Sequence, residues 1–265
     1  RGMSSAASDV YKRQLLTPQG KYLFEFIITK HKKGYFLECE KKIIDELFIK
    51  LNSYKFRSKV EILNLSNEFV VAVLSREKFL TLENSKDMLG YTTKFREDPI
   101  YLDPRHKDLG ARLITNLEKL HLSLKLLELK SSNLDEYYSV SNKLGIPQIN
   151  TDKLQNNLFG IECNLNELNG IDFKKGCYVG QENTARIKLK DKLSKRLFPV
   201  EVIEGDLSKN NIIHHENTEL GKVLINNKFP FAIVKFKDKN FKFEKIFKCG
   251  NASVKIKKPC WFKFD

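Results

Sequence analysis

The chain has 265 residues, of which 41% are hydrophobic and 30% charged, a composition typical of globular proteins rather than disordered or fibrous ones. Lys and Arg number 47 against 33 Asp and Glu, so the formal net charge is +14, spread along the whole chain. This charge favours anionic partners such as nucleic acid, phosphate or a polycarboxylate. The longest apolar run, Phe69–Leu74, is far shorter than the ~20 residues of a bilayer-spanning helix, so the sequence predicts no membrane partner.

The cysteines and histidines show no metal or disulfide pattern. The chain has five cysteines, an odd number, and no two of them are at CxxC spacing. The five histidines form no HExxH or similar ligand set. The sequence therefore predicts no disulfide framework, no structural metal site and a reducing compartment. The cysteines are Cys39, Cys163, Cys177, Cys249 and Cys260.

The first 14 residues, Arg1–Gln14, show no periodicity and resemble a translated sequencing-adaptor fragment. They lack the 7–15-residue apolar stretch of a signal peptide. A disordered natural N-terminus is the alternative. We expect residues 1–14 to be a non-native leader outside the fold and the natural N-terminus to be truncated.

The first elements expected after this leader are a hairpin and a helix. Gln19–Ile28 and Tyr35–Cys39 are rich in β-forming residues, and the polar link Lys30–Gly34 is typical of a turn between two strands. In Lys41–Tyr54 the apolar residues recur at helical spacing, which predicts an amphipathic helix.

A second strand pair and a helix follow. Val60–Leu65 and Phe69–Leu74 favour two more paired strands, which gives an α+β layer fold. The leucines of Gly110–Lys130 fit neither the helical nor the strand period. Ser132–Leu144 favours a helix that ends at Gly145–Pro147.

The last part of the chain is rich in short β-like segments separated by polar turns. This pattern predicts a small all-β domain, a barrel, over residues 193–265. Residues 15–192 then form a separate α+β region. The β-like segments are Leu193–Ile203, Leu220–Ile225, Phe231–Phe236 and Ala252–Ile256.

The most informative stretch surrounds Cys177, which Gly176 and Gly180 bracket. Glycine accepts a positive φ and lets the backbone approach a ligand closely. The residues after Gly180 favour a helix, so Cys177 is expected just before a helix N-terminus. There the helix dipole and the neighbouring Lys174 and Lys175 favour the thiolate. The spacing allows a nucleophile, a redox sensor, an iron ligand or simply a small buried apolar residue.

The segment Lys175-Gly-Cys-Tyr-Val-Gly-Gln-Glu182, followed by Arg186, closely resembles the K-G-C-Y-x-G-Q-E-x3-R signature of the YgfZ family. Members of this family are folate-binding proteins related to the T-protein of glycine cleavage (GcvT). The resemblance covers nearly the whole chain from Leu15 to Phe264, and family members usually begin some tens of residues earlier. Further matching motifs are Leu16–Lys21, Tyr101–Arg105 with Leu109-Gly110 and Arg112, Gly145–Pro147, Phe159–Asn164, and Trp261 after Pro259.

The resemblance implies a fold, a cofactor and a role. The fold is a GcvT-like folate-binding α+β region of mixed or antiparallel sheets with helices, followed by a C-terminal β-barrel. The implied cofactor is tetrahydrofolate or a one-carbon derivative. The implied role is an accessory factor, not clearly a turnover enzyme, that assembles or maintains iron–sulfur clusters, including those of tRNA-modifying radical enzymes. The implied partners are folate and iron–sulfur client proteins, and the protein is expected to be a monomer in the bacterial cytoplasm or the mitochondrial matrix.

The resemblance also assigns site residues. Cys177 is the candidate functional thiol, Gly176 and Gly180 shape the turn, and cations around the signature neutralise the ligand. Gln181 and Glu182 either cap the helix or contact the ligand, and Tyr178 either stacks on a pterin or lies in the core. Arg105 either contacts an anion or forms a salt bridge within its own turn. The predicted cofactor-binding residues are Lys175, Gly176, Tyr178, Gly180, Gln181, Glu182, Arg186, Arg105 and Gln148, with Lys174 and Lys188 as further cations.

Two departures from the family pattern affect the expected folate contacts. Gln148 follows the G-I-P motif where family members often have Glu, and no Arg lies in Ser139–Lys143 where many have one. A neutral Gln can still pair with pterin N–H groups, but without charge assistance.

Two other functions compete with this interpretation. A true aminomethyltransferase needs a carboxylate near the reactive folate nitrogens, and T-proteins carry paired Asp after their G-G turn. Here only Glu25 follows Gly20, and the signature cysteine is foreign to T-proteins. A basic RNA-binding module fits the charge, but the sequence has no RNP-like strand, KH-type loop or zinc knuckle, so direct nucleic-acid binding is not expected.

Overall fold

The computed structural model describes residues 10–173, 176–189, 193–207 and 211–263. The chain divides into two compact units, each of which is described by itself. The first unit comprises residues 10–14, Phe24–Asn133 and Leu168–Gly170, and the second comprises Leu15–Leu23, Leu134–Glu167 and the residues from Ile171 onward. None of the helices among the described residues has the length and apolar character required to cross a bilayer.

Two antiparallel sheets form the framework of the first unit. One has three strands in the order β1-β2-β3, and the other has four in the order β4-β7-β6-β5. The strands are β1 (Val10–Leu16), β2 (Tyr22–His31), β3 (Gly34–Glu38), β4 (Phe69–Leu74), β5 (Thr92–Phe95), β6 (Asp98–Leu102) and β7 (Ala111–Asn116). The helices are α1 (Ile44–Tyr54), α2 (Arg76–Leu80) and α3 (Leu117–Leu126), with single 3-10 turns at Lys41–Ile43 and Lys107–Leu109.

The predicted hairpin and the first predicted helix are confirmed. β2 and β3 pair along their length, from Ile27 opposite Glu38 to His31 opposite Gly34. This pairing leaves a tight turn at Lys32 and Lys33. The expected helix over Lys41–Tyr54 begins with the 3-10 turn and continues as α1. The β-forming composition around a polar turn was a sufficient signal for the hairpin, and the helical spacing of apolar residues was a sufficient signal for the helix.

The predicted strand over Val60–Leu65 is wrong. These residues belong to an irregular connection between α1 and β4, and Val60 and Leu63 are more than half exposed. β4 pairs instead with β7, with Phe69 opposite Asn116 and Leu74 opposite Ala111. β-branched residues predict a strand only when another strand is available to pair with them.

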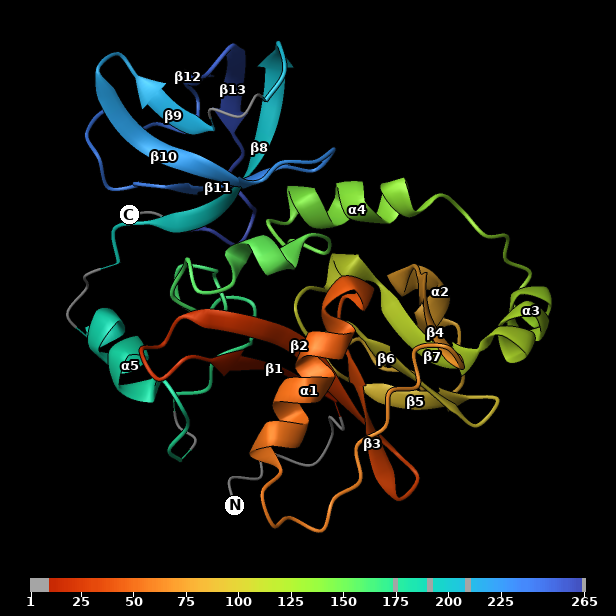
Figure 1. Ribbon diagram of the computed structural model, residues 1–265. Coiled ribbons are helices and arrows are strands. Elements are labelled where there is room, and N and C mark those ends of the chain that lie inside the picture. The colour runs from red at the N-terminus through yellow and green to blue at the C-terminus, as the bar shows by residue number, and fades with distance from the viewer. Residues whose placement is uncertain (1–9, 174–175, 190–192, 208–210, 264–265) are drawn as a thin grey trace. The chain divides into compact units, whose positions relative to one another are not determined.

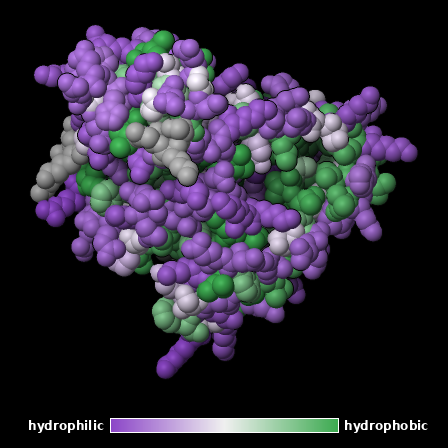
Figure 2. Space-filling view, turned by 45° about the horizontal axis from the view of Figure 1, so that its top comes forward, coloured by the Kyte–Doolittle hydropathy of each residue, from purple (hydrophilic) through white to green (hydrophobic). Residues whose placement is uncertain are grey.

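The ambiguous segment Gly110–Lys130 contains both a strand and a helix, β7 and then α3. Asn116 ends the strand, and its side-chain oxygen accepts a hydrogen bond from the Lys119 backbone N–H at 2.8 Å, which caps α3. Leucines lie on both the buried and the exposed side of this segment. Leu126, the last residue of α3, is 66% exposed, whereas Leu127 directly after it is buried. On the face shown in Figure 2 hydrophilic side chains dominate, and hydrophobic ones gather at the right, where Figure 1 shows α3.

Buried ion pairs fix the turn between β6 and β7. Asp103 is fully buried and accepts hydrogen bonds from the Arg105 guanidinium at 2.9 and 2.7 Å, with Arg112 3.5 Å away. Burial alone would raise the pKa of Asp103, but the ion pairs with Arg105 and Arg112 outweigh it and hold the pKa below its ordinary value of 3.8. Gly110 has φ +74°, and a Cβ there would lie 2.1 Å from the Leu74 carbonyl oxygen, so only glycine fits.

The predicted C-terminal barrel is confirmed within the second unit. Six strands close in the order β10-β11-β8-β13-β12-β9 (Figure 1). β9 and β12 were not expected, because each has only four residues, and β9 ends in two histidines. The strands are β8 (Arg196–Glu204), β9 (Ile212–His215), β10 (Thr218–Ile225), β11 (Phe231–Val234), β12 (Ile246–Cys249) and β13 (Ala252–Ile256).

The second unit also contains α4 (Leu134–Lys143), α5 (Gln181–Leu189) and a 3-10 turn at Thr151–Leu154. The predicted helix over Ser132–Leu144 is thus confirmed as α4. β8 begins three residues after the predicted domain boundary at residue 193. The boundaries themselves, 15–192 and 193–265, remain a prediction.

Two motifs that are far apart in the sequence meet where α4 ends. The Trp261 indole N–H donates to the Leu144 carbonyl oxygen at 2.7 Å. Gly145 has φ +71°, and a Cβ there would lie 2.6 Å from Pro259 Cγ. The glycine of G-I-P therefore leaves room for the C-terminal Pro259-Cys-Trp261, which anchors α4 to the end of the barrel chain.

The leader expected outside the fold extends less far than the sequence suggested. The structure places residues 10–14 in β1, with Val10 and Lys12 buried. Residues 1–9 lie outside the described part of the chain. Alternating burial within β1 was not visible as a pattern, since its buried positions include a lysine.

We predict that Arg105→Gln lowers the free energy of unfolding at pH 7 by about 3 kcal/mol, because it leaves the buried Asp103 with only the longer Arg112 pair. Urea unfolding measures this. The matched control is Lys94→Gln, which breaks an exposed pair with Glu97 and should cost less than about 0.5 kcal/mol.

The pH dependence gives a second measure of the same network. A carboxyl whose pKa is depressed by folding contributes stability that is present above its ordinary value of 3.8 and lost as the pH falls through the folded pKa. The wild type should lose this contribution in that acid range, and Arg105→Gln should lose less. Equal acid sensitivity in both proteins would contradict the assignment.

Candidate functional site

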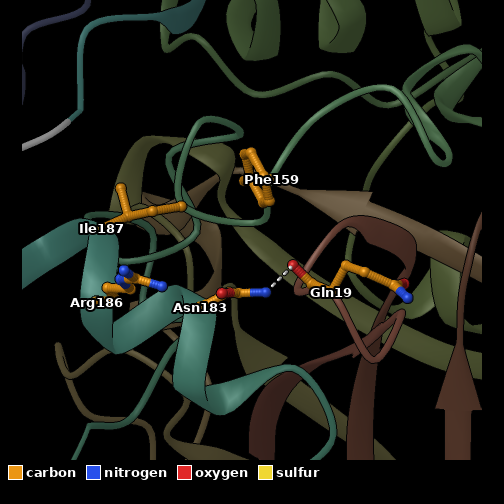
Figure 3. Close-up of a pocket in the computed structure, with 5 residues that line it drawn as sticks. All are labelled: Gln19, Phe159, Asn183, Arg186 and Ile187. Atoms are coloured by element: carbon orange, nitrogen blue, oxygen red, sulfur yellow. Dashed lines mark hydrogen bonds between the residues drawn. The ribbon is translucent and has the colours of Figure 1, made fainter.

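Three segments converge in the second unit around the turn that precedes β2. The Tyr22 N–H donates to the Leu158 carbonyl at 2.8 Å, and the Gly160 N–H donates to the Gly20 carbonyl at 3.1 Å. From the other side, the Asn183 side-chain amide of α5 donates to the Gln19 carbonyl at 3.0 Å (Figure 3). The Leu16–Lys21 motif, the Phe159–Asn164 motif and the helix of the cysteine signature thus form one local cluster.

A contact between two glycines holds this cluster together. Gly20 and Gly180 both have φ +82°, and a Cβ on Gly180 would lie 2.6 Å from the Thr17 carbonyl oxygen and 2.8 Å from Gly20 Cα. No side chain fits at either position without moving backbone atoms. The expectation that Gly180 shapes the turn has this physical basis. Gly176 differs, since a Cβ there would meet nothing within 4 Å.

The signature loop ends in a capped helix. The Gln181 side-chain oxygen accepts from the Tyr178 N–H at 3.2 Å while the Gln181 N–H donates to the Tyr178 carbonyl at 3.1 Å. The buried Thr184 hydroxyl donates to the Gly180 carbonyl at 2.9 Å. Of the two expected roles for Gln181, the structure shows local capping.

Cys177 lies in the loop before α5, as the sequence predicted, and its side chain is exposed. It is not in a disulfide, and the alternative of a buried core cysteine is therefore wrong. Lys174 and Lys175 lie outside the described residues. Among the described residues, no group of His, Cys, Asp and Glu side chains is arranged to hold a metal ion.

A small pocket opens beside α5, with a volume of about 220 Å³. Its lining combines an aromatic ring, an aliphatic side chain, two amides and one guanidinium (Figure 3). Arg186 is exposed and has no acidic partner among the described residues, so its charge is available to an anion. The lining residues are Gln19, Phe159, Asn183, Arg186 and Ile187.

Sequence reasoning predicted only Arg186 of these five residues. Gln19, Phe159 and Asn183 are at variable or apolar positions of motifs, and only the close approach of the three segments brings them together. Glu162 was not among the predicted site residues either. Its carboxylate accepts the Phe159 N–H at 2.8 Å, and burial raises its pKa above 4.5 despite that hydrogen bond.

The remaining predicted residues are distributed over both units. Tyr178 is partly buried, and burial together with Asp172 raises its pKa, whereas Glu182 is exposed on α5. Gln148 is partly buried in the second unit after α4. Arg105 belongs to the first unit, where it forms the salt bridge within its own turn.

Glu25, the one carboxylate available for aminomethyltransferase chemistry, is engaged in ion pairs. Its oxygens lie 3.2 Å from Lys12 Nζ and 3.5 Å from an Arg105 guanidinium nitrogen. Both of its carboxylate oxygens are thus engaged by charged side chains, which leaves no oxygen of Glu25 without a partner.

We predict that Gly180→Ala destabilises the protein by more than about 2 kcal/mol, since the added Cβ meets backbone atoms in a left-handed conformation. The same change should increase the rate at which a thiol reagent modifies Cys177. Urea unfolding and thiol labelling measure the two effects. The matched control is Gly176→Ala, which has open space and should change neither; equal effects from both variants would rule out the glycine contact as the cause.

The chain is similar in sequence to mitochondrial iron–sulfur cluster assembly factors. It is 31% identical to IBA57 of Mus musculus over 205 residues, which are 74% of this chain and 54% of that protein. It is 30% identical to IBA57 of Homo sapiens over 195 residues, 71% and 52% of the two chains. The IBA57 homolog of Dictyostelium discoideum is 29% identical over 181 residues, which cover 68% of this chain and 44% of that protein. The chain therefore spans about half the length of these relatives.

The fold is that of an aminomethyltransferase of glycine cleavage. The crystal structure of aminomethyltransferase T from Bartonella henselae matches with a TM-score of 0.72 over 97% of this chain and 76% of that one. The sequence identity is 11%, so the match concerns the fold alone. No family model matches the chain. By sequence, then, the chain is similar to IBA57 iron–sulfur cluster assembly factors, and its α+β region and barrel have the fold of the T-protein.

Proposed function

We propose that this chain is the folate-binding part of an iron–sulfur cluster assembly factor of the mitochondrial matrix, in which Cys177 is the functional thiol. The observation that carries the proposal is the exposed Cys177 in a loop that the Gly20–Gly180 contact and the capped α5 hold in place. The similarity to assembly factors named as mitochondrial supports the role and the compartment. The client proteins, among them radical enzymes that modify tRNA, belong to the same proposal.

The pocket beside α5 suits one part of a tetrahydrofolate. The ring of Phe159 and the side chain of Ile187 offer apolar contacts to an aromatic group. Arg186, which has no acidic partner within the described part of the chain, offers a charge-assisted hydrogen bond to a carboxylate. The aminobenzoyl-glutamate end of a folate carries both of these groups, an aromatic ring and a carboxylate. With about 220 Å³ the pocket is smaller than the roughly 300–1,000 Å³ usual for whole ligands, so the pterin would lie beyond it.

The bound folate would supply one-carbon or redox chemistry, and the protein's own residues would bind and orient it. Arg186 would hold the anionic end. Glu162 would keep Phe159 in place through the hydrogen bond to its backbone N–H. Gln148, Tyr178 and Glu182 remain proposed contacts for the rest of the ligand.

Cys177 would act on the cluster or its iron as cargo. Cysteine thiolates are the ordinary ligands of iron–sulfur clusters. A single exposed thiolate would supply one ligand to the cluster, and a client protein would supply the others. This arrangement suits transfer of the cluster to a client better than its permanent storage. The exposure of Cys177 makes such an approach sterically open.

The alternative of a glycine-cleavage aminomethyltransferase is not favoured. Glu25 is the carboxylate that would have to act near the folate nitrogens, and it is occupied by Lys12 and Arg105. The T-protein fold alone does not bring the reaction with it.

We predict that Cys177→Ala abolishes support of iron–sulfur enzyme activity in cells that lack their own assembly factor. The measured quantity is the activity of a cluster-dependent enzyme divided by the amount of that enzyme in the cells. The matched control is Cys260→Ala, which removes the other exposed cysteine and should support wild-type activity. Full activity of the Cys177→Ala cells would exclude the thiol from the function.

We predict saturable binding of tetrahydrofolate under anaerobic conditions, measured by calorimetry, and a loss of about tenfold or more in affinity for Arg186→Gln. A hydrogen bond to a charged group is worth about 1.5–3 kcal/mol, which corresponds to that factor. Lys222→Gln, an exposed change on the barrel, is the control and should bind normally. No binding by the folded wild type would leave the assembly role standing but remove folate from it.

A further inference from the structure

The connection between α1 and β4 exposes large apolar side chains. Phe56 is 85% exposed, Val60 55% and Leu63 63%, and Ile49 on the last turns of α1 is 69% exposed. These residues lie within one continuous stretch of the first unit, at the lower end of α1 and in the loop that follows it (Figure 1). Single exposed apolar residues are ordinary, but a run of them in one loop marks an interaction surface.

Phe56 occupies a position that usually belongs to glycine. Lys55 caps α1, and Phe56 directly after it has φ +46°. The residue at this place commonly adopts the left-handed conformation and is most often Gly, because a bulky side chain is disfavoured there. Here the strained backbone carries a nearly fully exposed aromatic ring. Nothing inside the first unit benefits from that placement.

The same loop is strongly basic. Lys55, Arg57 and Lys59 alternate with Phe56 and Ser58, and Glu61 is the sole acidic residue between Tyr54 and Leu63. The turn between β2 and β3 also reaches the lower edge of Figure 1. It presents Lys32 and Lys33, followed by Tyr35, which is 65% exposed.

We propose that residues 55–63 bind the surface of a membrane that contains anionic lipids. In this basic–apolar loop, defined as Lys55, Phe56, Arg57, Lys59, Val60 and Leu63, the apolar side chains would enter the boundary between headgroups and acyl chains. The cations would pair with the lipid phosphates. Such surface association needs no membrane-spanning helix, because apolar contact and attraction to anionic headgroups act together.

The composition of the loop favours a lipid surface over a nucleic acid. Single-stranded nucleic acids bind to aromatic rings on which bases stack, with cations along the backbone. Val60, Leu63 and Ile49 cannot stack on bases, yet they make up most of the exposed apolar side chains. A protein partner would have to present a groove shaped to these protruding side chains, whereas the boundary between headgroups and acyl chains accepts them without one.

The test is co-sedimentation of the whole chain with vesicles of two compositions. One set is phosphatidylcholine alone, and the other is phosphatidylcholine with phosphatidylglycerol in about a 3:1 ratio. We expect binding to the anionic vesicles only, weakened by added salt. Phe56→Ser should lower the partition coefficient about tenfold, and the triple change of Lys55, Arg57 and Lys59 to Gln about a hundredfold.

Matched controls separate this loop from general charge and hydrophobicity. Leu126→Ser removes a 66% exposed leucine from α3, and the triple change of Lys222, Lys239 and Lys242 to Gln removes three exposed cations from the barrel unit. Both controls should bind like the wild type. All variants should retain the unfolding transition of the wild type, since every substituted side chain is exposed except Lys55, which is partly exposed.

Three results would overturn the proposal. The first is no binding to anionic vesicles. The second is binding that the loop variants leave unchanged. The third is binding of single-stranded RNA, at the same ionic strength, that the loop variants abolish while vesicles are not bound. None of these results bears on Cys177 or on tetrahydrofolate, so the proposed function stands or falls separately.

Discussion

The local structure around Cys177 depends on the contact of Gly180 with Gly20. The backbone of the signature loop lies directly on the turn before β2, at distances that allow no Cβ on Gly180 and leave only 3.1 Å for one on Gly20. The Gly160 N–H of the Phe159 loop donates to the Gly20 carbonyl of the same turn. Three segments that are distant in the sequence therefore contact one another at this turn. The direction of α5, the place of Arg186 and the exposure of Cys177 all follow from these contacts.

The motif residues then separate into those with a structural role and those without one. Gly180, Gln181 and Thr184 make turn, cap and helix contacts, Gly145 makes room for Pro259, and Asn164 donates from its buried side chain to the Leu197 carbonyl at 2.7 Å. Each of these contacts stabilises the local fold. Cys177 and Arg186 are exposed instead and have no packing role in the described part of the chain. Their place in the signature is therefore best explained by chemistry.

The sequence predicted those elements whose pattern is local. α1 follows from helical spacing, the β2–β3 hairpin and four of the barrel strands follow from β-forming runs between polar turns, and α4 follows from its start and stop residues. The loop before α5 follows from its glycines. Val60–Leu65 failed because its β-branched residues have no strand to pair with, and β7 with α3 failed because leucines continue unbroken across a strand-to-helix junction. The pocket could not be predicted, because Gln19, Phe159 and Asn183 carry no chemical signature and meet only through the glycine contact.

The positively charged side chains fall into two groups, buried ones that are paired and exposed ones. In the first unit Arg105 and Arg112 are buried against Asp103 and Glu38, so their charges are neutralised inside the fold. The excess therefore has to lie at the surface, where its meaning depends on its neighbours. Beside the ring of Phe159 and in a small pocket, Arg186 suits a compact anion. Around the protruding Phe56, the same kind of charge suits an extended anionic surface, because the apolar side chains there need a medium to enter rather than a ligand to enclose.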